Sequence, residues 1–424
     1  MRKISAVVSL FALLSATPAL AQEAEKPEYP SPNAIVDAAP ASDWVTIAPS
    51  DLLVMDLAAD SEGNARRVVI QLMPEPFSQG WIRNIRKLAA AHWWDGTSIN
   101  RVQDNYVVQW GDAGYDNPES GETEQKALPE GLATVPENGY VVDGDTLSEF
   151  TVTSRITASD PEKTAAVQTL MQRSGNPKLT EEQHLEAIES AMKIMGSAPD
   201  GEPTARERVA LLSIESTQTE ITSQGWHERD GYAKWVEFWR GWPLANFQSS
   251  TWENEDGESV PRPTNTQRHV LESQKIYQQI ERNDFWPIHC YGALGVGRNY
   301  SPDTGSGAEL YTVIGHAPRH LDRNIAVVGR VIEGIEHLSS LPRGKGQLGF
   351  YEDASKRVPI ISIRLGDALA EEAPPAFEYL DTESATFAKY TDARANRRDP
   401  SFIKPAGGAD ICNIPVPVRR FKGE

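Results

Sequence analysis

The sequence feature that most constrains the fold is a pair of blocks, residues 51–112 and 288–366, built from short apolar runs separated by turn residues. In the first block, the apolar run 52–57 is followed by a turn cluster at 60–64 and a second run at 67–72. Short apolar runs bounded by Gly, Asn, Asp, Ser and Pro predict β-strands. The blocks therefore predict a mainly β chain, and a barrel is one architecture that buries such strands.

Helical spacing occurs at few places in these blocks. After Pro76, apolar residues recur at helical spacing, which predicts an amphipathic helix. Its apolar residues are Trp81, Ile82, Ile85, Leu88 and Ala89. A second helix is expected near residues 333–341. We also expect two strands in 99–112, separated by a kink at 104–105, and a last strand at 358–365.

Residues 113–287 separate the two blocks, and we interpret them as a large insertion of mixed or helical structure. Thr180 and Gln183 have the spacing of a capping box, which predicts the start of a helix. The insertion is rich in tryptophan, with Trp226, Trp235, Trp239, Trp242 and Trp252. These side chains either pack against the barrel or form an exposed aromatic surface for protein clients.

The composition of the chain excludes several classes of function. Lys and Arg number 41 against 60 Asp and Glu, which gives a formal net charge of −19. Nucleic acid and anionic membranes are bound through clustered basic side chains, so neither is an expected partner. The sequence lacks a nucleophile elbow, a P-loop and a zinc-binding helix motif, and the glycines at 292–297 lack the dinucleotide fingerprint. We therefore expect no cofactor and no metal.

The first 21 residues have the pattern of a cleavable export signal. A basic start at Arg2 and Lys3 precedes an apolar run, which ends in the small-residue pattern Ala19, Leu20, Ala21. A membrane anchor is the alternative, but the apolar run is short and contains proline. Cleavage after Ala21 would leave a chain of formal net charge −21, because one Arg and one Lys are removed. The expected compartment is the periplasm, which is oxidising.

Two flanking segments and two cysteines complete the organisation of the chain. Residues 22–50 are rich in Pro, Ala and Glu and are interpreted as a linker, and residues 367–424 as a C-terminal extension. The chain has two cysteines, Cys290 and Cys412. In an oxidising compartment we expect them to form a disulfide that ties the extension to the second block. Two buried free thiols are the alternative.

Six motifs in a fixed order point to one protein family. They are residues 94–102, 106–112, 292–298, 306–312, 321–322 and 328–334. Together they resemble the cyclophilins, a family of peptidyl-prolyl cis-trans isomerases. The resemblance covers residues 51–112 and 292–365. It implies an eight-stranded antiparallel barrel capped by two helices, with a groove for proline-containing polypeptide clients on its outer face. We expect a monomer that isomerises X-Pro bonds.

The resemblance also assigns roles to individual residues. Arg101 occupies the position of the family's catalytic arginine, and Gln109 matches the glutamine that contacts the substrate backbone. The other groove positions are Tyr106, Val107, Gly297, Arg298, Glu309, Tyr311, His320, Leu321 and Ile325. Taken alone, Arg101 would be a surface arginine on an edge strand; the ordered motifs favour the catalytic interpretation.

The groove departs from the family pattern, mainly at its polar rim. There Arg298 replaces an asparagine, Glu309 a glutamine and Ile325 a histidine, while Tyr311 replaces a pocket phenylalanine. We expect the Glu309 carboxylate to lie within hydrogen-bond reach of Arg101, where it would either orient the guanidinium or occupy it. Two alternatives therefore stay open: a catalytically weak peptide-binding module or chaperone, and a structural envelope protein.

Overall fold

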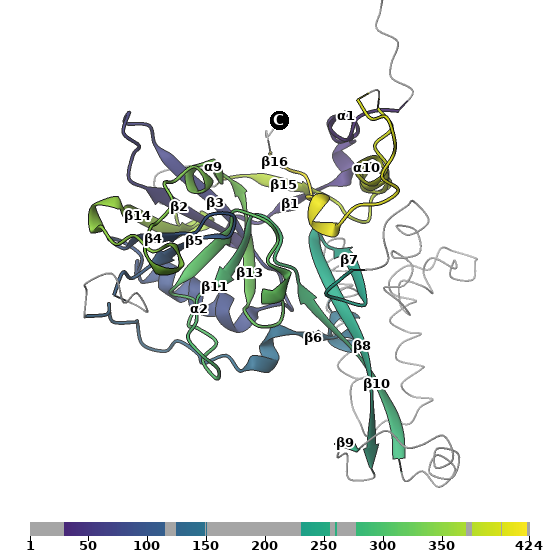
Figure 1. Ribbon diagram of the computed structural model, residues 1–424, viewed down its shortest axis with the longest axis horizontal. Coiled ribbons are helices and arrows are strands. Elements are labelled where there is room, and N and C mark those ends of the chain that lie inside the picture. Colours follow the sequence, from purple (N-terminus) through teal and green to yellow (C-terminus); the bar gives the residue numbers. More distant parts are fainter. Residues whose placement is uncertain are drawn as a thin grey trace, which may run out of the picture.

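The structure is a computed structural model that describes residues 29–114, 124–148, 150, 230–254, 259–260, 277–369, 375–399 and 401–421. The expected export signal and the expected helix after Thr180 lie outside these residues. The described strands form a closed barrel, a five-stranded sheet and a three-stranded sheet (Figure 1). None of the described helices combines the length and the apolar character needed to cross a membrane.

Eight antiparallel strands close the barrel, which confirms the predicted fold class. They are β2 (Leu52–Leu57), β3 (Arg66–Leu72), β4 (Ser98–Val102), β5 (Val107–Gly111), β11 (Ala293–Val296), β12 (Leu310–Val313), β13 (Val327–Glu333) and β14 (Val358–Leu365). Their order is β11-β12-β5-β4-β14-β2-β3-β13, and β13 pairs back onto β11. Every barrel strand falls within 51–112 or 288–366, so the insertion leaves the barrel after β5 and returns before β11.

Strand β2 is buried on both faces, which explains why its sequence is a continuous apolar run. Leu53 and Met55 belong to the barrel core, whereas Leu52 and Val54 belong to a second cluster together with Phe377. A continuous apolar run is typical of a strand that is covered on both sides. The cover is the three-stranded sheet of β1 (Trp44–Ile47), β15 (Phe377–Leu380) and β16 (Val418–Arg420).

Two helices pack on the barrel, but they differ in length. The first, α2 (Gln79–Ala90), buries its predicted apolar stripe in the barrel core, and Trp81 and Leu88 are fully buried. The second, α9 (Glu336–Ser339), is a single turn. The expected kink between β4 and β5 is a turn in which Asn105 has a φ of 51°. Asparagine adopts this left-handed conformation more readily than most residues.

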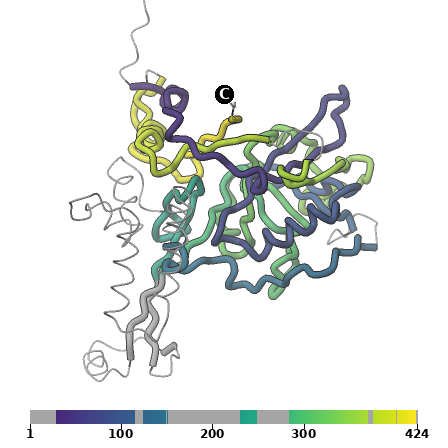
Figure 2. The backbone as a smooth tube through the Cα atoms, turned by 180° about the vertical axis from the view of Figure 1, so that it is seen from behind, coloured from purple at the N-terminus to yellow at the C-terminus, as the bar shows by residue number. Residues whose placement is uncertain are grey.

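The interpretation of residues 22–50 as a linker is wrong for the part that follows residue 31. This part contains α1 (Pro32–Asp37) and β1, and β1 pairs antiparallel with β15 in the C-terminal extension. The physical reason is burial, because Trp44 and Ile47 are only 8% and 3% exposed. Helix α1 packs beside α10 (Ala385–Ala395), so the first described segment packs on the C-terminal extension (Figures 1 and 2).

The described part of the insertion is mainly β, where the sequence predicted a mixed or helical region. Its strands are β6 (Val142–Asp143), β7 (Trp235–Trp239), β8 (Trp242–Asn254), β9 (Ser259–Val260) and β10 (Tyr277–Pro287). Strands β8 and β10 pair along their length and extend away from the barrel (Figure 1). Aromatic and β-branched residues in β7 favour a strand, and they outweigh the acidic loops around it.

Of the tryptophans of the insertion, Trp239 and Trp242 pack inward, whereas Trp235 is half-buried. Trp239 and Trp242 are 5% and 2% exposed and belong to the barrel core. Of the two proposed roles, packing against the barrel is therefore the one these two residues have. Trp226 and the side chain of Trp252 lie outside the described residues.

Candidate active site

The residues predicted to line the proline pocket are far apart in the sequence but pack in one apolar cluster. They are Tyr106, Val107, Tyr311, Leu321 and Ile325. They come from the start of β5, from β12, and from the 3-10 turn η4 (Arg319–Leu321) with the loop after it. Apolar side chains of β11, β12 and β13 complete the cluster. The barrel strands therefore hold the pocket on a rigid support.

The ring of Tyr311 lies against a strand position that requires glycine. Gly295 is the partner of Tyr311 across β11 and β12. A Cβ atom at position 295 would lie 2.2 Å from the ring Cζ of Tyr311. Such an overlap would force the ring out of its place, since packed side chains leave no room for it. Gly295 therefore allows Tyr311 to lie flat in the pocket.

Arg101 lies beside this pocket and is held by neutral acceptors. In the β4–β5 pairing it is the partner of Gln109, and its Nη1 donates to Gln109 Oε1 at 3.1 Å. Its Nε donates to the Leu348 carbonyl at 2.6 Å, and its Nη2 donates to Gln103 Oε1. The guanidinium also lies 5.7 Å from the ring centre of Tyr106, within the range of a cation–π contact.

The guanidinium of Arg101 keeps its charge without a carboxylate partner among the described residues. Burial lowers its pKa from the usual value, and Tyr106 and Tyr311 oppose this shift. An arginine remains protonated even so. Burial raises the pKa of both tyrosines, that of Tyr311 well above its usual value, so their hydroxyl groups stay neutral. The apolar cluster therefore has one fixed positive charge beside it.

The expected pairing of Glu309 with Arg101 is wrong. Glu309 is 4% exposed, and its Oε1 accepts a hydrogen bond from the amide of Asp112 at 2.7 Å. A Cβ atom at Gly111 would lie within 2.2 Å of the Glu309 carboxylate. Glu309 precedes β12 and therefore lies at the far end of β5, whereas Arg101 lies opposite Gln109 in the middle of that strand. The Glu309 carboxylate orders the end of β5 and forms no ion pair with Arg101.

The remaining predicted groove positions, His320, Arg298 and Gly297, make the following contacts. His320 stacks on Tyr106, with ring centres 6.3 Å apart and planes 10° from parallel. The Nε of Arg298 donates to the Asn324 carbonyl at 2.9 Å, so this side chain crosses to the loop after η4. Gly297 lies beside Glu309, where a Cβ would approach the Glu309 Cβ to 2.9 Å.

Three residues around the guanidinium were missed by sequence reasoning. Gln103 follows Arg101 by two positions on the same strand, so strand alternation could have placed both side chains on one face. Leu348 and Phe350 come from the loop before β14, and the Phe350 ring centre lies 5.6 Å from the guanidinium. No local pattern relates that loop to β4.

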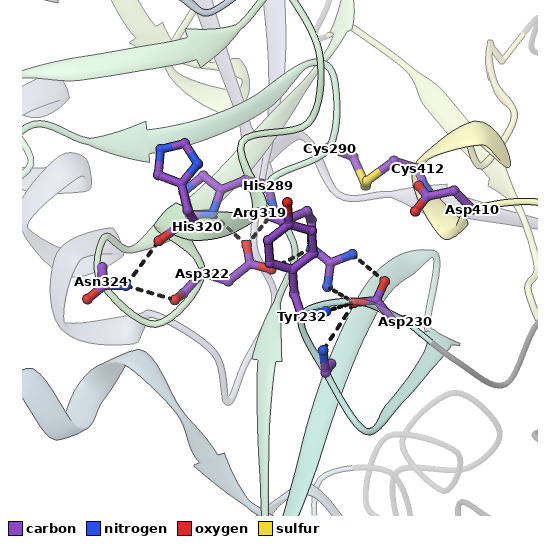
Figure 3. Close-up of polar contacts among 11 residues, drawn as sticks. Asp230, Tyr232, His289, Cys290, Arg319, His320, Asp322, Asn324, Asp410 and Cys412 are labelled. Atoms are coloured by element: carbon purple, nitrogen blue, oxygen red, sulfur yellow. Dashed lines mark hydrogen bonds and ion pairs between the residues drawn. A yellow bond between two sulfur atoms is a disulfide. The ribbon is translucent and has the colours of Figure 1, made fainter.

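A disulfide joins Cys290 to Cys412, with Cα atoms 5.1 Å apart (Figure 3). It links the segment before β11 to the C-terminal extension, as the sequence led us to expect. In the described ranges, no group of three His, Cys, Asp or Glu side chains is arranged to hold a metal ion.

Comparisons with known proteins give one family. Residues 230–365 match the family model described as cyclophilin type peptidyl-prolyl cis-trans isomerase/CLD. The match runs from residue 230, within the insertion, to the end of β14, and it includes Tyr311 but not Arg101. Among solved structures, the chain is similar to cyclophilin AquaCyp293 from Hirschia baltica, at 16% identity and a TM-score of 0.47, over 90% of this chain and 94% of that chain. Among curated proteins nothing matches.

Proposed function

We propose that this chain is a cyclophilin-type peptidyl-prolyl cis-trans isomerase in which Arg101 assists rotation about X-Pro bonds of exported polypeptides. The match of residues 230–365 to the cyclophilin-type family model supports this proposal. In this proposal the proline ring enters the apolar pocket of Tyr106 and Tyr311. The observation that carries it is the guanidinium beside that pocket, whose charge no described carboxylate neutralises.

The chemistry of the reaction explains why such a charge is useful. Resonance gives the peptide C–N bond partial double-bond character, so rotation has a barrier of about 18–20 kcal/mol. Before proline the cis and trans forms are close in energy, so catalysis has to act on the rate. In the twisted state the prolyl nitrogen becomes pyramidal and accepts a hydrogen bond. A donor that is placed at this nitrogen stabilises the twisted state more than either planar state.

Arg101 and Gln109 divide the work in this mechanism. Nε, Nη1 and Nη2 of Arg101 each use one N–H in an internal hydrogen bond, which fixes the plane of the guanidinium. The guanidinium has five N–H groups, so two are left to donate to the substrate. Gln109 accepts from Arg101 through Oε1, so its Nε2 is directed to donate to a substrate carbonyl. The pocket binds the ring, Gln109 orients the chain, and Arg101 acts on the nitrogen.

The proposed substrates follow from the start of the sequence. Residues 1–21 have the pattern of an export signal that is cleaved after Ala21. A disulfide between Cys290 and Cys412 suits an oxidising compartment, and the periplasm is the one we propose. The clients would be proline-containing segments of other exported proteins. The acidic net charge supports the proposal that nucleic acid is not a partner.

The decisive experiment is an isomerisation assay on an Ala-Pro peptide, in which NMR exchange spectroscopy measures the cis-trans rate. We expect Arg101→Ala to lower kcat/KM by about 100-fold, which is typical for the loss of one preorganised donor. Arg83→Ala is the matched control, because Arg83 is exposed on α2. Equal activity in wild type and Arg101→Ala would refute the role of Arg101.

A peptide-binding chaperone of low isomerase activity is the second candidate. The observation that favours it is that three internal acceptors already engage the Arg101 side chain. It predicts that the protein suppresses aggregation of an unfolded client and that Arg101→Ala does so equally well.

A further inference from the structure

Behind the apolar pocket lies a continuous chain of buried polar side chains. The hydroxyl of Tyr311 and Nε2 of His289 share a hydrogen bond of 2.8 Å, and Nδ1 of His289 donates to Asp322 Oδ1 at 2.9 Å. The backbone amide of His289 donates to the same carboxylate oxygen at 3.0 Å. The His289 side chain is fully buried, so each of its nitrogens needs a partner within the protein.

The chain of contacts continues into the insertion. Arg319 Nε donates to Asp322 Oδ2 at 2.6 Å, and the Nη atoms of Arg319 donate to both oxygens of Asp230 at 2.6 and 3.0 Å (Figure 3). Asp230 in turn accepts from the amides of Tyr232 and Ala233, at the turn that leads into β7. The Arg319 guanidinium lies 5.3 Å from the ring centre of Tyr232.

Because this network is buried, it links the turn at Asp230 rigidly to the turn η4. The side chains of Arg319, Asp230 and Asp322 are 3%, 5% and 4% exposed. Buried charges are tolerated only when they are paired and hydrogen-bonded, and here one guanidinium bridges two carboxylates. Removing any one member would leave a neighbour without its partner.

The network holds the turn that forms one side of the pocket. Arg319 and Asp322 flank His320, which stacks on Tyr106, and Leu321, which packs in the pocket. The turn η4 is therefore fixed from behind by Arg319, while Tyr311 is fixed from behind by His289. Both supports end on the same Asp322 carboxylate.

We propose that Asp230, Arg319, Asp322 and His289 are positioning residues for the isomerase, through which the end of the insertion holds Tyr311 and Leu321 in place for the proline ring. This inference rests on the proposed location of the proline pocket. It gives the insertion a function: its turn at Asp230 completes the support of the groove, although it touches no substrate.

The test measures KM and kcat separately for the full-length protein with the Ala-Pro peptide. Because the network positions a binding surface, Asp230→Asn should raise KM by about five- to tenfold and change kcat by less than about twofold. Arg319→Lys keeps the charge but loses the two-pronged contact with Asp230, and should act in the same direction. Asp60→Asn is the matched control, because Asp60 is an exposed turn carboxylate that also accepts two backbone amides.

A second measurement separates positioning from a general loss of stability. The ¹⁵N shift of His289 Nε2 should change in Asp230→Asn, and the urea midpoint of each variant is recorded alongside. A double variant with Tyr311→Phe should show a smaller effect of Asp230→Asn on KM than the single variant does. A lower urea midpoint with KM and the ¹⁵N shift unchanged would overturn the proposal, and so would fully additive effects on KM.

The outcome is independent of the role given to Arg101. If Arg101→Ala kept full activity while Asp230→Asn raised KM, the catalytic assignment would fail and the positioning network would stand. If Arg101→Ala lost activity while Asp230→Asn and Arg319→Lys behaved as wild type, the network would fail and the catalytic assignment would stand.

Discussion

Two arginines flank the proposed proline pocket, and they differ in the groups that accept their hydrogen bonds. Arg101, at the front, is held by two glutamine side chains and a backbone carbonyl. Arg319, at the rear, is held by the carboxylates of Asp230 and Asp322. Neutral acceptors orient a guanidinium and leave its field intact, whereas carboxylates cancel the field. In the proposed mechanism the charge of Arg101 acts on the substrate, whereas the charge of Arg319 serves the structure.

The largest expected effect concerns the disulfide beside the rear region, by which we mean the network of Asp230, His289, Arg319 and Asp322. Replacing both cysteines, Cys290→Ser with Cys412→Ser, should lower the free energy of unfolding by about 4–5 kcal/mol, because the disulfide closes a long loop. Urea unfolding measures this, and kcat should stay at the wild-type value. Reducing agent should produce the same loss in wild type and none in the double variant. A loss of activity that matched the loss of stability would contradict the separation of front and rear.

Replacing each arginine by alanine compares the two regions directly. Arg319→Ala leaves two buried carboxylates without their partner and should cost about 3–5 kcal/mol of unfolding free energy. Arg101→Ala removes hydrogen bonds to neutral groups and should cost about 1 kcal/mol, while activity falls. Urea unfolding of both variants checks the ranking. Equal losses of stability would show that Arg101 is a structural residue like Arg319.

Tyr311 contacts both regions: its ring packs in the apolar cluster, and its hydroxyl is hydrogen-bonded to His289. Gly295 leaves the space that the ring occupies. Gly295→Ala puts a Cβ into the ring and should cost about 1–3 kcal/mol through overpacking. KM for a prolyl peptide should rise with it, since the ring has to move. Thermal unfolding and peptide kinetics measure the two effects. An unchanged KM would indicate that the proline ring binds elsewhere.

Acid should weaken the rear region and spare the front. Burial alone would raise the pKa of Asp322, but His289 and Arg319 outweigh it and hold that pKa below the usual 3.8. A carboxyl group with a lowered pKa in the folded state stabilises the protein above the unfolded pKa, and this stability is lost as the pH falls through the folded value. The stability difference between wild type and Asp322→Asn should therefore shrink below about pH 4.

The stability difference between wild type and Arg101→Ala provides the contrast. Among the described residues the Arg101 side chain has no carboxylate partner, so the stability difference from wild type should stay constant over the same acid range. Urea unfolding at several pH values measures both gaps. A constant gap for Asp322→Asn would show that its pKa is not lowered in the folded protein.

The sequence was informative wherever neighbouring residues or an ordered motif carried the signal. The apolar stripe of α2 and the bounds of β14 were predicted from local periodicity. The pocket of Tyr106, Val107, Tyr311, Leu321 and Ile325 followed from the family resemblance. The strands of the first and last segments were missed because their apolar residues are few and find partners only at the opposite end of the chain.

The rear network shows why some contacts escape prediction. His289 lies 22 and 33 residues from its two side-chain partners, and Asp230 lies 89 residues from Arg319. No spacing rule connects positions so far apart. The one local sign was the replacement of a family phenylalanine by Tyr311. Its hydroxyl is the group that engages His289, so the departure from the pattern marked the network without revealing it.

The sheet of β1, β15 and β16 has a consequence for how the chain is made. The ribosome synthesises β1 and β2 early, but β15 and β16, which cover the outer face of β2, are synthesised only after all eight barrel strands. Until then the side chains of Leu52 and Val54 are uncovered, and the growing chain exposes apolar surface that can aggregate. Contacts over so long a stretch of sequence also form slowly. A protein proposed to assist the folding of others therefore completes its own fold late, and its early strands are themselves candidates for a chaperone's protection.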